Sequence, residues 1–153
     1  MEERLIRVGI THGDINGIGY EVILKTFSDL RIADLCTPII YGSSKIAAYH
    51  RKALDLQPVN ISIISQAEEA GLNRINIINC ADEEAKVELG KSTTIAGEAA
   101  FKALEAAVND LKRGVIDVLV TAPINKHNIQ NDQFHFPGHT EYLEEAFGGP
   151  GKK

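Results

Sequence analysis

The chain has 153 residues, of which 44% are hydrophobic and 24% are charged, and its formal net charge at pH 7 is −5. This composition is typical of a globular domain, and the negative charge argues against a nucleic-acid-binding surface. The apolar runs are far too short to span a bilayer, and the opening MEER lacks the pattern of a signal peptide. Cys36 and Cys80 are too few for a disulfide framework or a zinc site. We therefore expect a cytoplasmic protein that binds neither membranes nor nucleic acid.

Short apolar runs alternate with segments of helical periodicity along most of the chain. The expected strands cover residues 5–10, 38–41, 59–64, 75–79 and 115–120. The expected helices cover residues 19–30, 44–54, 93–113, 125–130 and 140–147. This alternation predicts an α/β fold with a largely parallel sheet flanked by helices.

Several boundaries follow from single residues. Ser43 or Ser44 is expected to cap the second helix, Ser92 or Thr93 the long fourth helix, and Thr140 the last helix. The strands at 59–64 and 75–79 lie so close in sequence that we expect an antiparallel pair or an edge element, because a parallel crossover usually needs a dozen or more residues. The acidic segment 81–91 reads as a surface connection.

A glycine-rich stretch, THGDINGIGYE at residues 11–21, follows the first expected strand. Its spacing matches neither a Walker A sequence nor a dinucleotide-binding fingerprint. It predicts a turn from strand to helix, where unpaired amides at a helix amino terminus can bind an anion. Asp14 could bind a hydroxyl or amine of a ligand, or it could brace the turn through its own backbone.

A second stretch, VTAPINK at residues 120–126, follows the last expected strand, and FPGHTE follows at residues 136–141. Pro123 cannot continue an interior strand, so the chain must turn there and present Lys126 at the edge of the sheet. Ligand sites of open α/β sheets lie at the carboxyl ends of the strands. Lys126 is therefore either a solvated surface lysine or an electrostatic group that holds a substrate or a developing oxyanion.

Together the two stretches resemble the 4-hydroxythreonine-4-phosphate dehydrogenases, the PdxA family of pyridoxal phosphate biosynthesis. Gly13, Asp14, Gly17, Ile18, Gly19 and Glu21 match that family's amino-terminal motif. Ile15, Asn16 and Tyr20 stand where the family usually has Pro, Ala and Pro. The resemblance implies that His139 and Thr140 contact the phosphorylated substrate. His12, His50, His127 and His135 match no family motif and are expected to be surface or structural residues.

The resemblance also implies the wider architecture and chemistry. Family members are about twice as long, so residues 1–153 are expected to be a single α/β unit, the amino-terminal half of a two-lobed enzyme. That enzyme would resemble isocitrate and isopropylmalate dehydrogenases and work as a homodimer. It would oxidise and decarboxylate 4-phosphooxy-L-threonine with NAD or NADP and a divalent metal. The family's three metal-binding histidines lie downstream of the GHTE motif, so we expect no metal ligand within this chain.

Two other interpretations stay open at this point. A phosphate-handling enzyme of the phosphotransacetylase type shares the broader architecture, and the glycine-rich turn and Lys126 would serve it equally well. Alternatively, the chain by itself is a non-catalytic substrate-binding fragment. The GHTE motif favours the dehydrogenase over the transferase.

Overall fold

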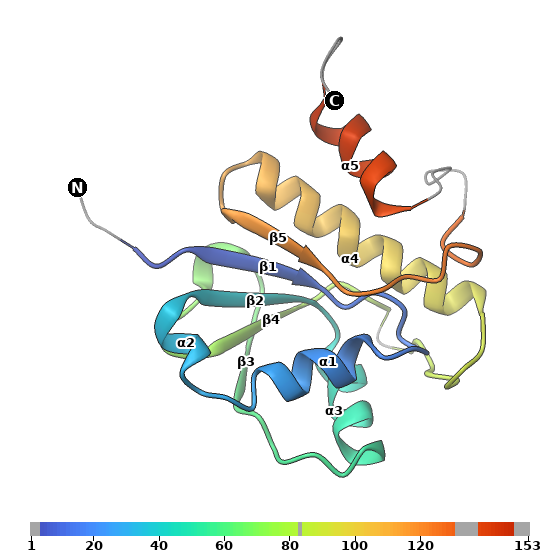
Figure 1. Cartoon of the computed structure of the whole chain (residues 1–153), viewed down its shortest axis with the longest axis horizontal. Helices are drawn as coiled ribbons and strands as arrows, with labels where there is room; N and C mark the ends of the chain where they lie inside the picture. Colours follow the sequence, from blue (N-terminus) through green and yellow to red (C-terminus); the bar gives the residue numbers. More distant parts are fainter. Residues whose placement is uncertain (1–3, 83, 131–137, 149–153) are drawn as a thin grey trace.

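The computed structural model describes residues 4–82, 84–130 and 138–148, which fold around a five-stranded sheet (Figure 1). The strands are β1 (Arg7–Thr11), β2 (Thr37–Gly42), β3 (Ile61–Ile64), β4 (Ile75–Asn79) and β5 (Val118–Thr121). Their order across the sheet is β3-β4-β2-β1-β5, and every neighbouring pair is parallel. This confirms the α/β class that the alternating sequence pattern predicts.

Helices connect the strands and cover both faces of the sheet. They are α1 (Gly19–Thr26), α2 (Ile32–Leu35), α3 (Ser44–Ala53), α4 (Thr94–Lys112) and α5 (His139–Phe147), with a short 3₁₀ turn, η1 (Ala67–Glu69). Figure 1 shows α4 on one side of the sheet and α1 and α3 on the other. The central strand β2 is buried along its whole length, as expected for a strand covered on both faces.

The two faces of β2 belong to two hydrophobic clusters. Ile40 packs with residues of α1 and α3, including Ile23 and Ile46. Ile39 and Tyr41 point to the opposite side and pack with alanines of α4. Because successive side chains of a strand alternate between faces, one apolar run supplies both clusters.

Residues 59–64 and 75–79 do not form the antiparallel pair that was one of the two expectations for them. β3 and β4 are parallel, with Ile61 opposite Ile75 and Ile63 opposite Ile77. The connection between them contains η1. Within residues 65–74 the chain returns from the end of β3 to the edge of the sheet at which the parallel strand β4 begins. β3 does lie at an edge of the sheet, as expected.

The expected helix over residues 19–30 ends early. α1 stops at Thr26, and α2 is a separate short helix that begins at Ile32. The hydroxyl of Thr26 donates to the carbonyl of Val22 (2.7 Å), and the hydroxyl of Ser28 donates to the carbonyl of Lys25 (2.6 Å). Such side-chain bonds compete with the helical ladder and favour its termination.

The expected helix over residues 125–130 is wrong, because residues 126–129 form only a turn. The Asn125 side chain accepts hydrogen bonds from the amides of His127 (2.9 Å) and Asn128 (3.2 Å). The amide of Ile129 bonds back to the carbonyl of Asn125 at 3.3 Å. The segment is thus a single turn, capped by Asn125, that does not continue into a helix.

The caps of the two central helices follow the sequence prediction. The Ser43 hydroxyl accepts from the amide of Ile46 (3.3 Å) at the start of α3, and the Thr93 hydroxyl accepts from the amide of Ala96 (3.1 Å) at the start of α4. Gly114, at a φ of +75°, stops α4 in the left-handed conformation that glycine adopts without strain.

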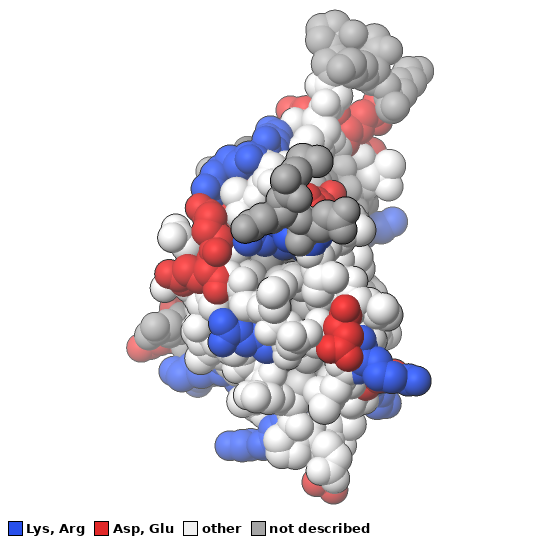
Figure 2. Space-filling view, turned by 90° about the vertical axis from the view of Figure 1, so that its left-hand side faces the viewer, with Lys and Arg blue, Asp and Glu red and all other residues white. Residues whose placement is uncertain are grey.

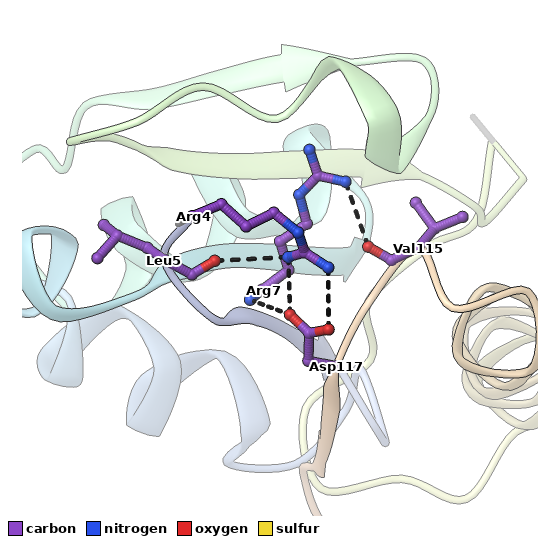
Figure 3. A network of polar contacts seen from close by, with 5 residues as sticks. All are labelled: Arg4, Leu5, Arg7, Val115 and Asp117. Atoms are coloured by element: carbon purple, nitrogen blue, oxygen red, sulfur yellow. Dashed lines mark hydrogen bonds and ion pairs between the residues drawn. The ribbon is translucent and has the colours of Figure 1, made fainter. Parts of the chain in front are cut away.

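A carboxylate joins the chain's amino terminus to the last strand (Figure 3). Asp117 accepts two hydrogen bonds from the Arg4 guanidinium (2.7 and 3.0 Å) and one from the Arg7 amide (2.9 Å). The Asp117 amide donates to the Arg7 carbonyl (2.9 Å), and the Arg7 side chain reaches the Val115 carbonyl (3.3 Å). These bonds fix the register of β1 against β5 at the end where both strands begin.

Figure 2 views the molecule from the side where β1 begins, and positive and negative side chains are mixed over that surface. Exposed ion pairs such as Arg31–Asp29 (2.8 Å) and Arg113–Glu68 (2.9 Å) contribute little to stability, because water and salt screen them. Among the described residues, no helix has the length and apolar character needed to cross a membrane.

Candidate functional site

The carboxyl ends of β1 and β5 lie side by side and lead into the two stretches that the sequence singles out. β1 and β5 are parallel neighbours, with Ile10 opposite Val120 and Thr11 opposite Thr121. The Asp14 amide donates to the Pro123 carbonyl at 2.8 Å, so the loops that follow the two strands touch. Asp14 and Lys126 therefore follow adjacent strands at one rim of the sheet.

The glycine-rich loop after β1, residues 12–19, is tightly built, and we call it the glycine corner. Gly13 has a φ of +68°, and a Cβ atom there would collide with the Pro123 carbonyl oxygen. A Cβ at Gly19 would collide with the backbone of His12. Only glycine allows these close approaches of backbone to backbone, which bring α1 and the β5 loop to the end of β1.

Asp14 braces this corner. One of its carboxylate oxygens, Oδ1, accepts from the Asn16 amide at 3.0 Å, and its carbonyl accepts from the Gly17 amide at 3.0 Å. The residue is half-buried. This matches the bracing role that the sequence left open, and the carboxylate keeps capacity for further bonds because each oxygen offers two lone pairs.

Lys126 lies beside the GHTE motif. It is exposed, and its Cε and Nζ lie 3.5 and 3.9 Å from the position that a Cβ on Gly138 would occupy. The Oε2 atom of Glu141 lies 3.6 Å from the same point. Gly138 itself is buried, so the ammonium group of Lys126 sits against the start of α5.

His139 is half-buried at the first position of α5. Burial and the nearby positive charge of Lys126 both lower its pKa, so the imidazole is neutral at pH 7. Its Nε2 atom is buried and has no hydrogen-bond partner among the described residues. Leaving a buried polar atom unpaired is costly, so this nitrogen is a candidate for bonding to a ligand.

Thr140 lies exposed within the first turn of α5 and does not cap it. The cap position is Gly138, in an extended conformation and without a side-chain cap bond, so the expectation for Thr140 is wrong. The first amides of α5 consequently have no side-chain acceptor at the cap, and such amides are suited to an anion. Residues Phe136, Pro137 and His135 of the same stretch lie outside the described residues.

The structure thus brings the candidate residues to one rim. Asp14 reaches Pro123 through its amide, and the turn after Pro123 carries Lys126. Lys126 in turn lies against Gly138 and acts electrostatically on His139. This arrangement combines one carboxylate, one ammonium group and one neutral imidazole, a set suited to a small anionic ligand that also carries hydroxyl or amino groups.

The three residues that depart from the family pattern are all buried beneath this rim. Ile15, Asn16 and Tyr20 are 0%, 3% and 1% exposed. Sequence reasoning gave none of them a role. The available signal was the combination of a large apolar, an amide and an aromatic residue within a loop, where such side chains need an interior to pack into.

Tyr20 is held by a buried histidine. Burial lowers the pKa of His12 to about 4, so its ring is neutral at pH 7. The Nε2 atom lies 3.0 Å from the Ala99 carbonyl, which can only accept, so Nε2 carries the proton. Nδ1 is then an acceptor, and the Tyr20 hydroxyl at 2.8 Å donates to it while accepting from the Ser43 amide (2.9 Å).

His50 completes this support. Its ring stacks on Tyr20 with centroids 5.4 Å apart, and its Nε2 lies 2.7 Å from the Ile15 carbonyl. His12 and His50 are thus structural histidines, as expected, and they tie the glycine corner to α3 and α4. His127, by contrast, is exposed.

Within the described ranges, no group of three or more His, Cys, Asp or Glu side chains could hold a metal ion. Cys80 is half-buried, and burial raises the pKa of its thiol to about 12. The described residues therefore do not offer a metal site of their own.

Comparison with known proteins gives a consistent result. The family model of the pyridoxal phosphate biosynthetic protein PdxA matches residues 34–152. A 4-hydroxythreonine-4-phosphate dehydrogenase from Bacteroides thetaiotaomicron is 62% identical over 152 residues, which are 99% of this chain and 42% of that protein. A D-threonate 4-phosphate dehydrogenase from Cupriavidus necator is 34% identical over 98% of this chain and 45% of its own length.

Among solved structures, a 4-hydroxythreonine-4-phosphate dehydrogenase from Burkholderia phymatum superimposes with a TM-score of 0.82 at 30% identity. The match covers 95% of this chain and 44% of that one. A terephthalate 1,2-cis-dihydrodiol dehydrogenase from Burkholderia xenovorans shares the fold at 20% identity, with a TM-score of 0.67. The chain spans less than half the length of each of these relatives.

Proposed function

The chain belongs to the PdxA family of pyridoxal phosphate biosynthetic proteins, and we propose that it forms the amino-terminal part of a dehydrogenase acting on 4-phosphooxy-L-threonine. The oxidation would use NAD or NADP, and the resulting 3-keto acid would lose carbon dioxide. The observation that carries this proposal is the meeting of Lys126 with His139 at the carboxyl rim of the sheet, where the buried Nε2 of His139 has no partner.

His139 and Thr140 are the proposed contacts to the substrate. A neutral imidazole can donate through Nε2 to a phosphate oxygen, and a bond to a charged acceptor is stronger than a neutral one. Thr140 is exposed in the same turn, so its hydroxyl can reach a ligand that lies over the amino terminus of α5. The free amides of that terminus add partial positive charge.

Lys126 is the proposed catalytic residue. Its ammonium group sits against Gly138, which places a positive charge next to the proposed phosphate position. As the substrate hydroxyl loses its proton so that the hydride can leave the same carbon, negative charge develops on the oxygen, and a fixed cation would stabilise that charge. Asp14, at the same rim, is proposed to accept a hydrogen bond from the substrate's amino or hydroxyl group.

The nicotinamide cofactor would accept the hydride, and a divalent metal would polarise the reacting oxygen. The described residues provide no metal-binding cluster, so we propose that the metal ligands and most of the nucleotide site lie outside this chain.

We further propose that residues 1–153 are one α/β unit of a two-lobed enzyme that works as a cytoplasmic homodimer. The relatives are more than twice as long as the region that this chain matches. The edge strand β5 supports the proposal, because its Val118 and Val120 remain 44% and 48% exposed. Exposed apolar side chains along an unpaired edge suit a surface that another part of the protein covers.

A second substrate has specific support. The Cupriavidus necator relative acts on D-threonate 4-phosphate, according to its name, and it matches nearly the whole chain. The two substrates share the phosphate but differ at carbon 2, where one carries an ammonium group and the other a hydroxyl. A carboxylate such as Asp14 favours the ammonium group, because the opposite charges attract. The higher identity to the Bacteroides thetaiotaomicron protein supports the same choice.

A chimera tests the proposed function. Residues 1–153 replace the matching region of the Bacteroides thetaiotaomicron relative, and NADH formation is followed with both phosphorylated substrates. We expect turnover of 4-phosphooxy-L-threonine with at least about tenfold higher kcat/KM than D-threonate 4-phosphate, since a factor of ten corresponds to about 1.4 kcal/mol of binding. A folded chimera that oxidises neither substrate would contradict the proposal, and a reversed preference would favour the second candidate.

A further inference from the structure

Asn16 lies in the glycine corner but makes its side-chain hydrogen bonds to a distant segment. Its Oδ1 accepts from the Glu88 amide at 2.7 Å. Its Nδ2 donates to the Lys91 carbonyl at 2.9 Å and to the Thr93 hydroxyl at 3.2 Å. Its backbone carbonyl accepts from the Gly90 amide at 2.9 Å. The residue is only 3% exposed, and the side-chain amide uses both its donor and its acceptor.

The segment that Asn16 holds, residues 88–93, is otherwise weakly anchored. Glu88, Leu89, Gly90 and Lys91 are all exposed, and Gly90 has a φ of +77° with no atoms near the position of a Cβ. The ion pair between Lys91 and Glu88 is long, at 3.7 Å, and exposed. The bonds to Asn16 are therefore the main polar attachment of this segment to the rest of the described chain.

The same residue holds both the start of α4 and Asp14. The Thr93 hydroxyl, which receives the Asn16 bond, also accepts from the Ala96 amide and caps α4. The backbone amide of Asn16 donates to Oδ1 of Asp14, and the backbone amide of Asp14 donates to the Pro123 carbonyl at the start of the Lys126 turn. A continuous set of hydrogen bonds thus runs from segment 88–93 through Asn16 and Asp14 to the loop after β5.

We propose that Asn16 is a positioning residue for the substrate site. Its side chain locks segment 88–93 and the amino terminus of α4 against the glycine corner. This lock holds the backbone of residue 16 in place, and the backbone amide of that residue in turn holds the Asp14 carboxylate at the rim. The role in catalysis rests on the proposed function, whereas the lock itself is a structural claim. The alternative is that Asn16 only fills a buried position and contributes to stability.

Hydrogen exchange in the chimera tests the lock directly. Asn16→Ala removes all three side-chain bonds, including the acceptor of the Glu88 amide, and leaves the Gly90 amide bonded only to a backbone carbonyl of a loosened segment. We therefore expect the amides of Glu88 and Gly90 to exchange about tenfold faster than in the parent, which corresponds to about 1.4 kcal/mol of lost local protection. Asn16→Asp keeps the acceptor for the Glu88 amide but loses the donor to Lys91, so Glu88 should keep more of its protection than in Asn16→Ala. The matched control is Asn60→Ala, at an exposed asparagine before β3, which should leave both amides unchanged.

Steady-state kinetics then separate positioning from bulk stability. Asn16→Ala should raise KM for 4-phosphooxy-L-threonine about three- to tenfold, while kcat stays within about twofold. The backbone amide that donates to Asp14 is retained in this variant, but without the side-chain bonds the backbone at position 16 is less firmly held, and the Asp14 carboxylate with it. Unchanged exchange at Glu88 and Gly90 overturns the lock. Faster exchange with unchanged KM overturns the positioning role. If the parent chimera oxidises neither substrate, the proposed function fails, and the exchange result still decides the lock.

Discussion

At the scale of single residues, His12 links the rim to the pH dependence of stability. Burial lowers its pKa to about 4 from the ordinary 6.5, partly offset by the bond to the Ala99 carbonyl. The folded state therefore binds fewer protons than the unfolded state between these two pH values. The contribution of His12 to the free energy of unfolding is therefore fully present above pH 6.5 and is lost as the pH drops towards 4. At 1.36 kcal/mol per pKa unit, the total loss is about 3 kcal/mol.

Urea denaturation at a series of pH values between 7 and 4.5 measures this loss. His12→Gln removes the titrating group, so the variant should be less stable at pH 7 but should lose less stability on acidification. Burial also lowers the pKa of His50, which contributes in the same direction in both proteins and cancels in the comparison. If the free energy of unfolding fell equally steeply with decreasing pH in the two proteins, His12 would not be the titrating group. Separately, an NMR signal from a protonated Nδ1 of His12 would contradict the assigned tautomer.

His139 gives the second prediction at this scale. In the chimera, His139→Ala should raise KM for the phosphorylated substrate about ten- to a hundredfold, since a hydrogen bond to a charged group contributes about 1.5–3 kcal/mol. The affinity for the nicotinamide cofactor should change little. His127→Ala is the control, because this exposed histidine lies in the neighbouring turn. Unchanged KM in His139→Ala would remove His139 from the site.

At the scale of elements, the contact between β1 and β5 depends on Asp117 (Figure 3). The Arg4 guanidinium and the Arg7 amide hold the pKa of this carboxyl below its usual range. We expect Asp117→Ala to lower the free energy of unfolding by about 1–2 kcal/mol, because the lost bonds involve a charged acceptor but remain open to solvent. Since the pKa is lowered in the folded state, this contribution is present above pH 4 and disappears as the pH falls further.

Chemical denaturation at pH 7 and at pH 3 measures both parts of this prediction. Asp117→Ala should differ clearly from the parent at pH 7 and much less at pH 3. Glu98→Gln changes an exposed acid on α4 and should leave stability within about 0.5 kcal/mol. A loss that persists at pH 3 would indicate a packing effect of the side chain instead of its charge.

The helices and strands were largely predictable from sequence. Strands buried on both faces are continuous apolar runs, and helices that pack on a sheet have a stripe of apolar residues along one side. The largely parallel sheet was also predicted, but the direction of β3 relative to β4 was not, since their apolar runs look the same whether the two strands are parallel or antiparallel. The turn at residues 125–130 was misjudged because Asn125 bonds to nearby amides and stops helix growth. The Asn16 network was invisible because it joins positions more than seventy residues apart.

At the scale of the whole molecule, β5 is the edge strand of the described sheet that leads into the Lys126 turn. Its pairing with β1 places the Lys126 turn at the rim, yet Val118 and Val120 remain nearly half exposed. These two side chains lie on the same face as Val8 and Ile10, beyond the part of that face where Ile10 packs against α1 and α3. The rim is thus built on an edge that suits further contact with protein.

The last prediction concerns residues 1–153 on their own, which should not oxidise either phosphorylated substrate even with NAD and an added divalent metal. The chain matches only 42% of the length of its Bacteroides thetaiotaomicron relative, and the exposed apolar edge at β5 suits the remainder of such a protein. The chimera differs from the 153-residue chain only by that remainder, so the pair isolates its contribution. NADH absorbance measures activity, and sedimentation shows whether the shorter chain associates through its exposed edge. Turnover by a monomeric 153-residue chain at a rate close to that of the chimera would place the complete reaction site within these residues.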